Sequence, residues 1–115
     1  MMPTYTREHL VAWEETKAAY RELIKTGDIT EWFGYGDKCR LCRTVGNHCS
    51  WCILFQQHYS IYQPNSCMHG KLKATYDDLY FTIQGEGKAS IATIRSLAKA
   101  RLAALVKRAK ENGVE

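Results

Sequence analysis

The chain has 115 residues, of which 45% are hydrophobic and 24% charged, a composition typical of one folded domain and not of a disordered tail. No apolar run approaches the roughly 18 residues needed to span a membrane, and the first residues lack the features of a signal peptide. The net charge of +4 permits nucleic-acid binding but is lower than in most dedicated binders. We therefore expect a single cytoplasmic domain over residues 1–115, without membrane association.

The first predicted element is a helix over about residues 6–26, within an N-terminal unit of residues 1–27. Gly27 is a natural stop, because glycine readily adopts the left-handed conformation that ends many helices. Apolar side chains recur at helical spacing and predict a stripe that faces the core. This stripe consists of Leu10, Trp13, Tyr20 and Ile24.

The second unit, residues 28–70, contains all five cysteines of the chain, and four of them form two Cys-x-x-Cys pairs. Two such pairs supply the four thiolates of a tetrahedral structural zinc site. Gly46-Asn47 lies midway between the pairs and predicts a tight turn, so we expect a zinc-stapled loop or short β-hairpin. An odd cysteine count and the reducing cytosol favour metal ligation over disulfides. The predicted ligands are Cys39, Cys42, Cys49 and Cys52.

Several alternatives to this ligand set stay open. Cys67 or, less favourably, His69 could replace Cys49 or Cys52, although Cys67 could equally be a small buried side chain. His48 and His58 are expected to be polar loop residues or outer groups of the site. Iron, in a rubredoxin-like site or a cluster, competes with zinc. A dithiol redox motif would require a βαβ setting, which the sequence does not indicate.

A closed four-cysteine site leaves no open coordination position, so we expect no enzymatic activity. The deaminase signature, the P-loop and the Gly-x-Ser-x-Gly elbow are all absent from the sequence. A cryptic nuclease is left as a minor alternative. No small-molecule substrate is evident from the sequence.

The third unit, residues 71–115, is predicted to be a helical hairpin. Its first helix covers about residues 71–84, with a strand over 79–83 as the alternative, and Gly85-Glu86-Gly87 forms the turn. Ser90 is a candidate N-cap of the second helix, and Gly113 closes it. The apolar stripe of this helix consists of Ile91, Ile94, Ala98, Leu102, Leu105 and Ala109.

The last helix is strongly basic, with no acidic residue between positions 88 and 110. Such a helix attracts phosphate or an acidic protein surface, although its cations could also form a solvated face that covers the edges of the core. These candidate binding residues are Lys88, Arg95, Lys99, Arg101, Lys107, Arg108 and Lys110.

Aromatic residues surround the cysteines and either pack around the metal or anchor an interface. They are Trp32, Phe33, Tyr35, Trp51, Phe55, Tyr59 and Tyr62.

The order of these features resembles a family of small uncharacterised phage proteins that carry two Cys-x-x-Cys pairs and a fifth cysteine. The resemblance covers most of the chain, and it implies an accessory phage protein that acts in the host cytoplasm and has Cys67 in its metal site. The matching elements are Trp13-Glu14-Glu15, Cys39 to Cys42, Cys49 to Cys52, Cys67, Tyr76-Asp77-Asp78 and the stretch from Ser90 onward.

Together these features predict a mainly α domain with one N-terminal helix, a zinc-stapled region and a C-terminal helical hairpin. The expected function is that of a non-enzymatic zinc-binding protein that binds, and thereby inhibits, a host or defence protein. The alternative is a DNA- or RNA-binding protein that uses its basic last helix.

Overall fold

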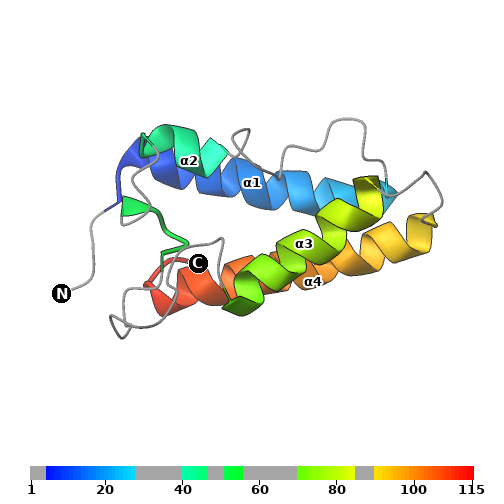
Figure 1. Cartoon of the computed structure of the whole chain (residues 1–115). Coiled ribbons are helices and arrows are strands. Elements are labelled where there is room, and N and C mark those ends of the chain that lie inside the picture. The colour runs from blue at the N-terminus through cyan, green and yellow to red at the C-terminus, as the bar shows by residue number, and fades with distance from the viewer. Residues whose placement is uncertain (1–4, 28–39, 47–50, 56–69, 85–89) are drawn as a thin grey trace.

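The computed structural model of the chain describes residues 5–27, 40–46, 51–55, 70–84 and 90–115 (Figure 1). Helices make up most of these residues, and no strand occurs among them, so the predicted mainly α class is confirmed. The helices are α1 (Arg7–Thr26), α2 (Arg40–Thr44), α3 (Gly70–Gln84) and α4 (Ile91–Glu111).

α1 begins at an N-cap that was not predicted and ends at the predicted glycine. The side-chain oxygen of Thr6 caps the helix by accepting a hydrogen bond of 3.1 Å from the backbone N–H of His9. At the other end Gly27 has φ 69°, and its N–H donates to the carbonyl of Leu23 at 2.8 Å. The prediction of a helix over 6–26 is therefore confirmed.

The buried face of α1 differs in part from the predicted stripe. Trp13 and Tyr20 are fully buried as predicted and Ile24 is half-buried, but Leu10 is 37% exposed and its assignment to the core was wrong. His9 occupies the buried position one residue earlier, because its ring nitrogens find hydrogen-bonding partners inside the molecule. The residues of α1 that are buried are His9, Ala12, Trp13, Lys17, Tyr20 and Leu23.

α3 is a helix along its whole length, so the alternative of a strand over 79–83 is excluded. Leu72 and Leu79 are two turns apart and bury their side chains in the core. On the same helix the rings of Tyr76 and Tyr80 stack with their centroids 5.5 Å apart.

α4 starts at the predicted cap, where the hydroxyl of Ser90 accepts a hydrogen bond of 3.1 Å from the backbone N–H of Thr93. Its last turn closes at Asn112, followed by Gly113 with φ 81°. Of the predicted stripe, Ile94, Ala98, Leu105 and Ala109 are buried, and Leu102 is half-buried.

The stripe of α4 was wrong at one position, since Ile91 is 61% exposed. The buried stripe instead includes Arg101, which lies between Ala98 and Leu105 at helical spacing.

α4 packs against both α1 and α3, and α2 packs against α1. α4 runs in the opposite direction to α1 and to α3 (Figure 1). Two contacts fix α4 and the residues after it on α1: Arg95 Nε donates to the carbonyl of Ile24 at 2.6 Å, and the indole N–H of Trp13 donates to the carbonyl of Glu115 at 3.2 Å.

The core includes side chains from all four helices and from residues 51–55. Its largest fully buried members are Trp13, Tyr20, Leu23, Leu41, Ile53, Leu79, Leu105 and His9. Among the described residues, no helix is long and apolar enough to cross a lipid bilayer.

Candidate metal centre and the residues that hold it

The described residues include one member of each predicted cysteine pair. Cys42 lies on α2, and Cys52 lies in the short segment 51–55. The side chain of Cys42 is outside the description, as are Cys39, Cys49 and the alternative ligand Cys67. His48, His58 and His69 also lie outside the described residues. Within the described ranges, no group of three or more His, Cys, Asp or Glu side chains could hold a metal ion.

Cys52 is the one predicted ligand whose side chain the structure describes. Its side chain is buried, and its Sγ accepts a hydrogen bond from the backbone N–H of Leu54 at 3.4 Å. A hydrogen bond donated to sulfur stabilises the deprotonated form, which is the form that binds zinc. This sulfur could therefore serve as one of the four ligands of a zinc ion.

The segment that follows Cys52 is a compact turn, in which the N–H of Phe55 donates to the carbonyl of Cys52 at 3.0 Å. Ile53 and Leu54 point their side chains into the core and are almost fully buried. Burying two large aliphatic side chains contributes on the order of 2–3 kcal/mol each, so the turn is attached firmly to the helices.

His9 connects this turn to α2. Its Nε2 accepts a hydrogen bond of 2.9 Å from the backbone N–H of Ile53, and its Nδ1 lies 2.6 Å from Oγ1 of Thr44. Because a backbone N–H can only donate, Nε2 carries no proton, and Nδ1 must donate to Thr44. The Thr44 hydroxyl in turn donates to the carbonyl of Leu41 at 2.9 Å. The four groups form a complete chain of hydrogen bonds.

This arrangement requires a neutral imidazole. Burial lowers the pKa of His9 from its ordinary value of 6.5, because an imidazolium ion would lose hydration inside the protein. Protonation of Nε2 would also place two donors opposite each other and break the bond to Ile53.

The end of α4 holds the other side of the same turn. The side-chain amide of Asn112 donates to the carbonyls of Ile53 and Phe55 at 2.6 and 2.7 Å. Arg108 Nη1 donates to the carbonyl of Leu54 at 2.9 Å. Three consecutive carbonyls after Cys52 thus accept hydrogen bonds from α4 and its C-cap.

A depression lies where the start of α1, the end of α2 and Trp51 meet. Its volume is about 510 Å³. Trp51 stands between the two cysteines of the second pair and is 61% exposed, so a large aromatic surface is presented beside the candidate site. The lining residues are Tyr5, Thr6, His9, Thr44, Val45, Gly46 and Trp51.

The basic residues predicted on the last helix have different environments. Lys99, Lys107 and Lys110 are exposed, and so is Arg95, although it donates to the end of α1. Arg108 is half-buried against the 51–55 turn. Lys88 lies outside the described residues.

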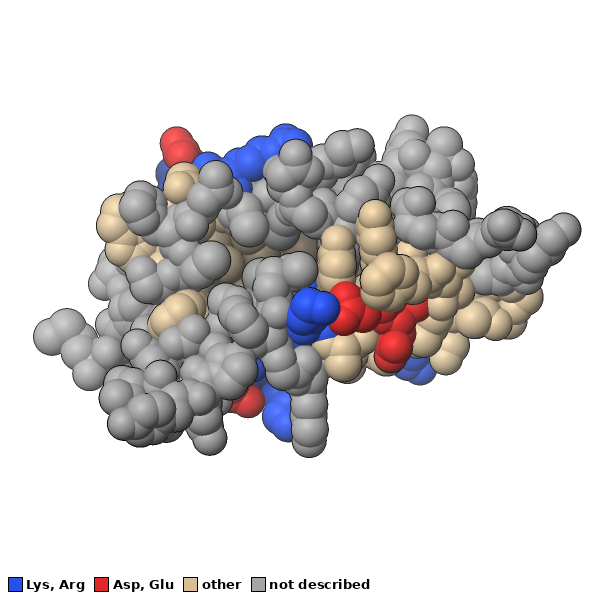
Figure 2. Space-filling view, in the orientation of Figure 1, with Lys and Arg blue, Asp and Glu red and all other residues tan. Residues whose placement is uncertain are grey.

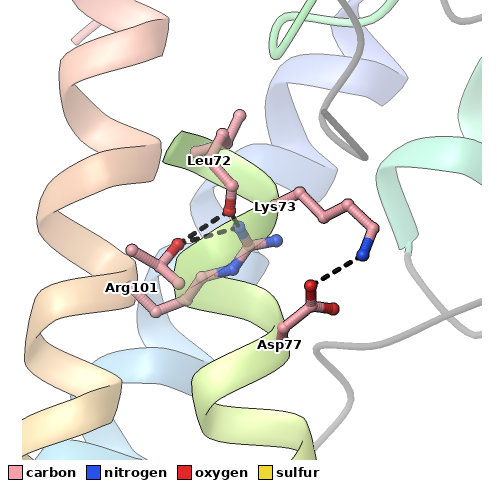
Figure 3. Close-up of polar contacts among 5 residues, drawn as sticks. Leu72, Lys73, Asp77 and Arg101 are labelled. Carbon is pink, nitrogen blue, oxygen red and sulfur yellow. Dashed lines mark hydrogen bonds and ion pairs between the residues drawn. The ribbon is translucent and has the colours of Figure 1, made fainter. Parts of the chain in front are cut away.

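Arg101 is only 5% exposed and reaches across to α3 (Figure 3). Its Nη1 donates to the carbonyl of Leu72 at 2.6 Å and to Oγ1 of Thr75 at 3.2 Å. Its guanidinium also lies 5.5 Å from the ring centroid of Tyr76, which adds a cation–π contact. These contacts are internal, so Arg101 serves to join α3 and α4.

Acidic side chains lie beside basic ones elsewhere on the surface. Figure 2 shows both signs of charge together on the described part of the face that it presents. One such pair is Lys73 with Asp77 on α3, at 2.6 Å. An exposed pair of this kind contributes little to stability, but it neutralises part of the basic field.

His9 and Asn112 were not predicted from the sequence to be residues of the site. The helical spacing could have indicated both, since each is a polar residue that falls on the buried side of its helix. His9 lies one turn before Trp13, and Asn112 lies seven residues after Leu105. Polar residues at such positions must find partners, and here both find them in the 51–55 turn.

Comparisons with known proteins give no relative for this arrangement: no family model, curated protein or solved structure matches the chain.

Proposed function

We propose that the chain is a non-enzymatic zinc protein that acts by binding another protein through the surface around Trp51. The zinc ligands in this proposal are Cys39, Cys42, Cys49 and Cys52, with Cys67 as the alternative fifth candidate. The ion closes the 28–70 region as a structural staple, and α3 and α4 form a helical hairpin with its turn at residues 85–87.

Zinc is supported by the chemistry of Cys52. Its sulfur accepts a backbone hydrogen bond of the kind that supports a ligating thiolate, and the sequence supplies a partner cysteine three residues before it. A closed site with four thiolates would contribute folding free energy and would leave no position for a substrate.

A protein partner is supported by one observation above all: Trp51 is largely exposed on a turn that is otherwise fixed to α1 and α4. A rigidly mounted, exposed tryptophan is the kind of side chain that dominates protein interfaces. Its neighbours in the depression include Tyr5, which is half-buried and provides further aromatic surface. Inhibition of a host or defence protein in the cytoplasm is the form of binding that a phage accessory protein would use.

The proposal is tested in two steps. Elemental analysis and native mass spectrometry on protein purified without added metal should give one zinc per chain. Affinity capture from host extract should then yield one protein, whose binding is lost in Trp51→Ala and retained in the control Phe81→Ala, which removes an equally exposed aromatic from α3. Iron in place of zinc, or equal loss with both variants, would contradict the proposal.

Nucleic-acid binding is the second candidate, and it is favoured by the exposure of Lys99, Lys107 and Lys110 on α4. Phosphate contacts release counterions, so such binding would weaken steeply with salt. A shift assay on duplex and single-stranded nucleic acid at two salt concentrations distinguishes it from salt-insensitive capture of one protein.

A further inference from the structure

We propose that His9 and Asn112 are positioning residues for the metal centre, so that the affinity for zinc depends on α1 and on the end of α4 as well as on the cysteines. This inference rests on the zinc site of the proposed function. It concerns two side chains that do not ligate the ion and that are far from the cysteines in the sequence.

His9 joins the two cysteine-bearing segments directly. Its Nδ1 holds Thr44, two residues after Cys42, and its Nε2 holds Ile53, the residue after Cys52. The imidazole is fully buried and both of its nitrogens are engaged, so the ring has little freedom to rotate. One rigid side chain of α1 therefore sets the distance between α2 and the 51–55 turn.

Asn112 sets the orientation of the turn. Its amide bonds the carbonyls on both sides of Leu54, the residue whose N–H donates to Cys52 Sγ. If the turn rotated about its own axis, both carbonyls would leave the amide, and the direction of the Cys52 sulfur would change with them. The hydrogen bond to the sulfur and the amide's bond to the Ile53 carbonyl thus fix the peptide unit between Ile53 and Leu54 from both sides.

These bonds are made within the helical part of the fold and require no metal. They place part of the loop before the ion binds, which lowers the ordering cost that binding must otherwise overcome. The coupling is reciprocal: if His9 and Asn112 strengthen zinc binding, then bound zinc must strengthen the attachment of the turn to α1 and α4.

The test compares zinc dissociation constants, measured by competition with a chromophoric chelator, in variants that remove these bonds. His9→Phe fills the space and removes both ring nitrogens, whereas Asn112→Leu removes both amide donors at similar volume. We expect each to weaken zinc binding by about tenfold or more, as the loss of one or two buried hydrogen bonds implies. His9→Gln retains an acceptor for Ile53 and should recover part of the affinity.

Arg101→Met is the matched control. The substitution weakens the contact between α3 and α4, and the arginine that it removes donates its hydrogen bonds to α3 and not to the turn. We expect it to lower the melting temperature while changing the zinc dissociation constant by less than about threefold. The second readout is the thiolate-to-cobalt charge-transfer spectrum of the Co²⁺-loaded protein, which reports ligand geometry. It should change in His9→Phe and Asn112→Leu and remain unchanged in Arg101→Met.

The possible outcomes separate the two proposals. Wild-type protein without zinc would remove the proposed function and this inference together. Zinc binding that is weakened equally in all three variants, or unchanged in His9→Phe and Asn112→Leu, would overturn this inference alone. If His9→Phe does not fold, the comparison is made with His9→Gln and Asn112→Leu instead. Unchanged zinc affinity and unchanged cobalt spectra in both of these variants would also overturn this inference.

Discussion

Replacing Arg101 by lysine and by methionine separates its internal role from a role in binding phosphate. In Arg101→Met the chain loses the hydrogen bonds to the Leu72 carbonyl at 2.6 Å and to Thr75 Oγ1 at 3.2 Å. The contact with the Tyr20 hydroxyl at 3.4 Å is long enough to be neglected. Two hydrogen bonds from a charged donor contribute about 1.5–3 kcal/mol each, and relief from burying the charge offsets part of that loss.

We therefore expect Arg101→Met to lower the free energy of unfolding by about 1–2 kcal/mol. Arg101→Lys keeps a buried charge, but the lysine side chain is one atom shorter than the path to Nη1, the nitrogen that donates to both acceptors, so it leaves that charge poorly compensated. Its expected cost is about 2–4 kcal/mol, larger than that of methionine although lysine is the chemically closer residue. For a chain of this size, 1 kcal/mol corresponds to a shift in melting temperature of about 4 °C.

The assay is urea denaturation followed by far-UV circular dichroism, with thermal melts as a second measurement. Arg95→Met is the control on the same helix, since Arg95 is exposed and makes one hydrogen bond to the described part of the chain, and it should cost about 1 kcal/mol or less. If Arg101→Lys proves as stable as the wild type, the buried role of the guanidinium is refuted. If Arg101 contacted phosphate instead, a nucleic-acid shift assay would give the opposite ranking, with affinity retained in Arg101→Lys and lost in Arg101→Met.

The remaining predictions concern pH, the end of α1 and the start of α4. Burial lowers the pKa of His9 below 6.5, so as the pH falls the unfolded chain binds a proton at this residue before the folded chain does. The contribution of His9 to stability is therefore complete above pH 6.5 and is lost as the pH falls below it. Urea denaturation at pH of about 8 and about 5.5 should reveal this loss in the wild type, and the difference should shrink in His9→Gln. Gly27→Ala should cost about 1–2 kcal/mol, because φ is 69° and an added Cβ would lie 2.5 Å from Cγ2 of Ile91; in thermal melts, adding Ile91→Ala should recover only the part due to the clash. Ser90→Ala should cost about 1 kcal/mol through loss of the N-cap, while Ser90→Gly should cost a few tenths, and equal melting temperatures for wild type and Ser90→Ala would contradict the capping role.

α1, α3 and α4 were predictable because their signals are local, whereas the short helix α2 lies in a segment that was expected to be a loop or short hairpin. Gly27 and Ser90 mark helix ends through the conformation of one residue and one short hydrogen bond, and neither depends on distant parts of the chain. The period of the apolar residues then distinguishes helix from strand, except over 79–83, where a run of five residues is too short to decide.

The buried polar residues were not predictable from the same signals. His9 meets its partner 44 residues away, and Asn112 meets its partners 59 and 57 residues away. Periodicity assigns a helix face from apolar residues alone, so it chose Leu10 over His9 and passed over Arg101. A polar side chain is buried only if the fold supplies a partner, and that condition is not visible in the sequence near it.

The cysteine pairs differ from the buried polar residues, because their signal in the sequence is local. Their spacing is a strong local indication of a metal site, yet spacing fixes only how the sulfurs lie relative to one another. It does not determine how the loop sits on the helices. In the structure the 51–55 turn is held on the helices by hydrogen bonds to its backbone from two sides, made by His9, Arg108 and Asn112.

The attachment of the turn to the helices also affects how Trp51 is presented to a partner. Trp51 directly precedes this turn, so we expect its exposed indole to be oriented by the helices and, if the proposed function holds, by the ion as well. The variant Asn112→Leu still contains Trp51, but it lacks the two hydrogen bonds that orient the turn. It should therefore weaken capture of the partner, with Trp51 intact, even in zinc-saturated protein. Undiminished capture would mean that the metal alone orients this surface.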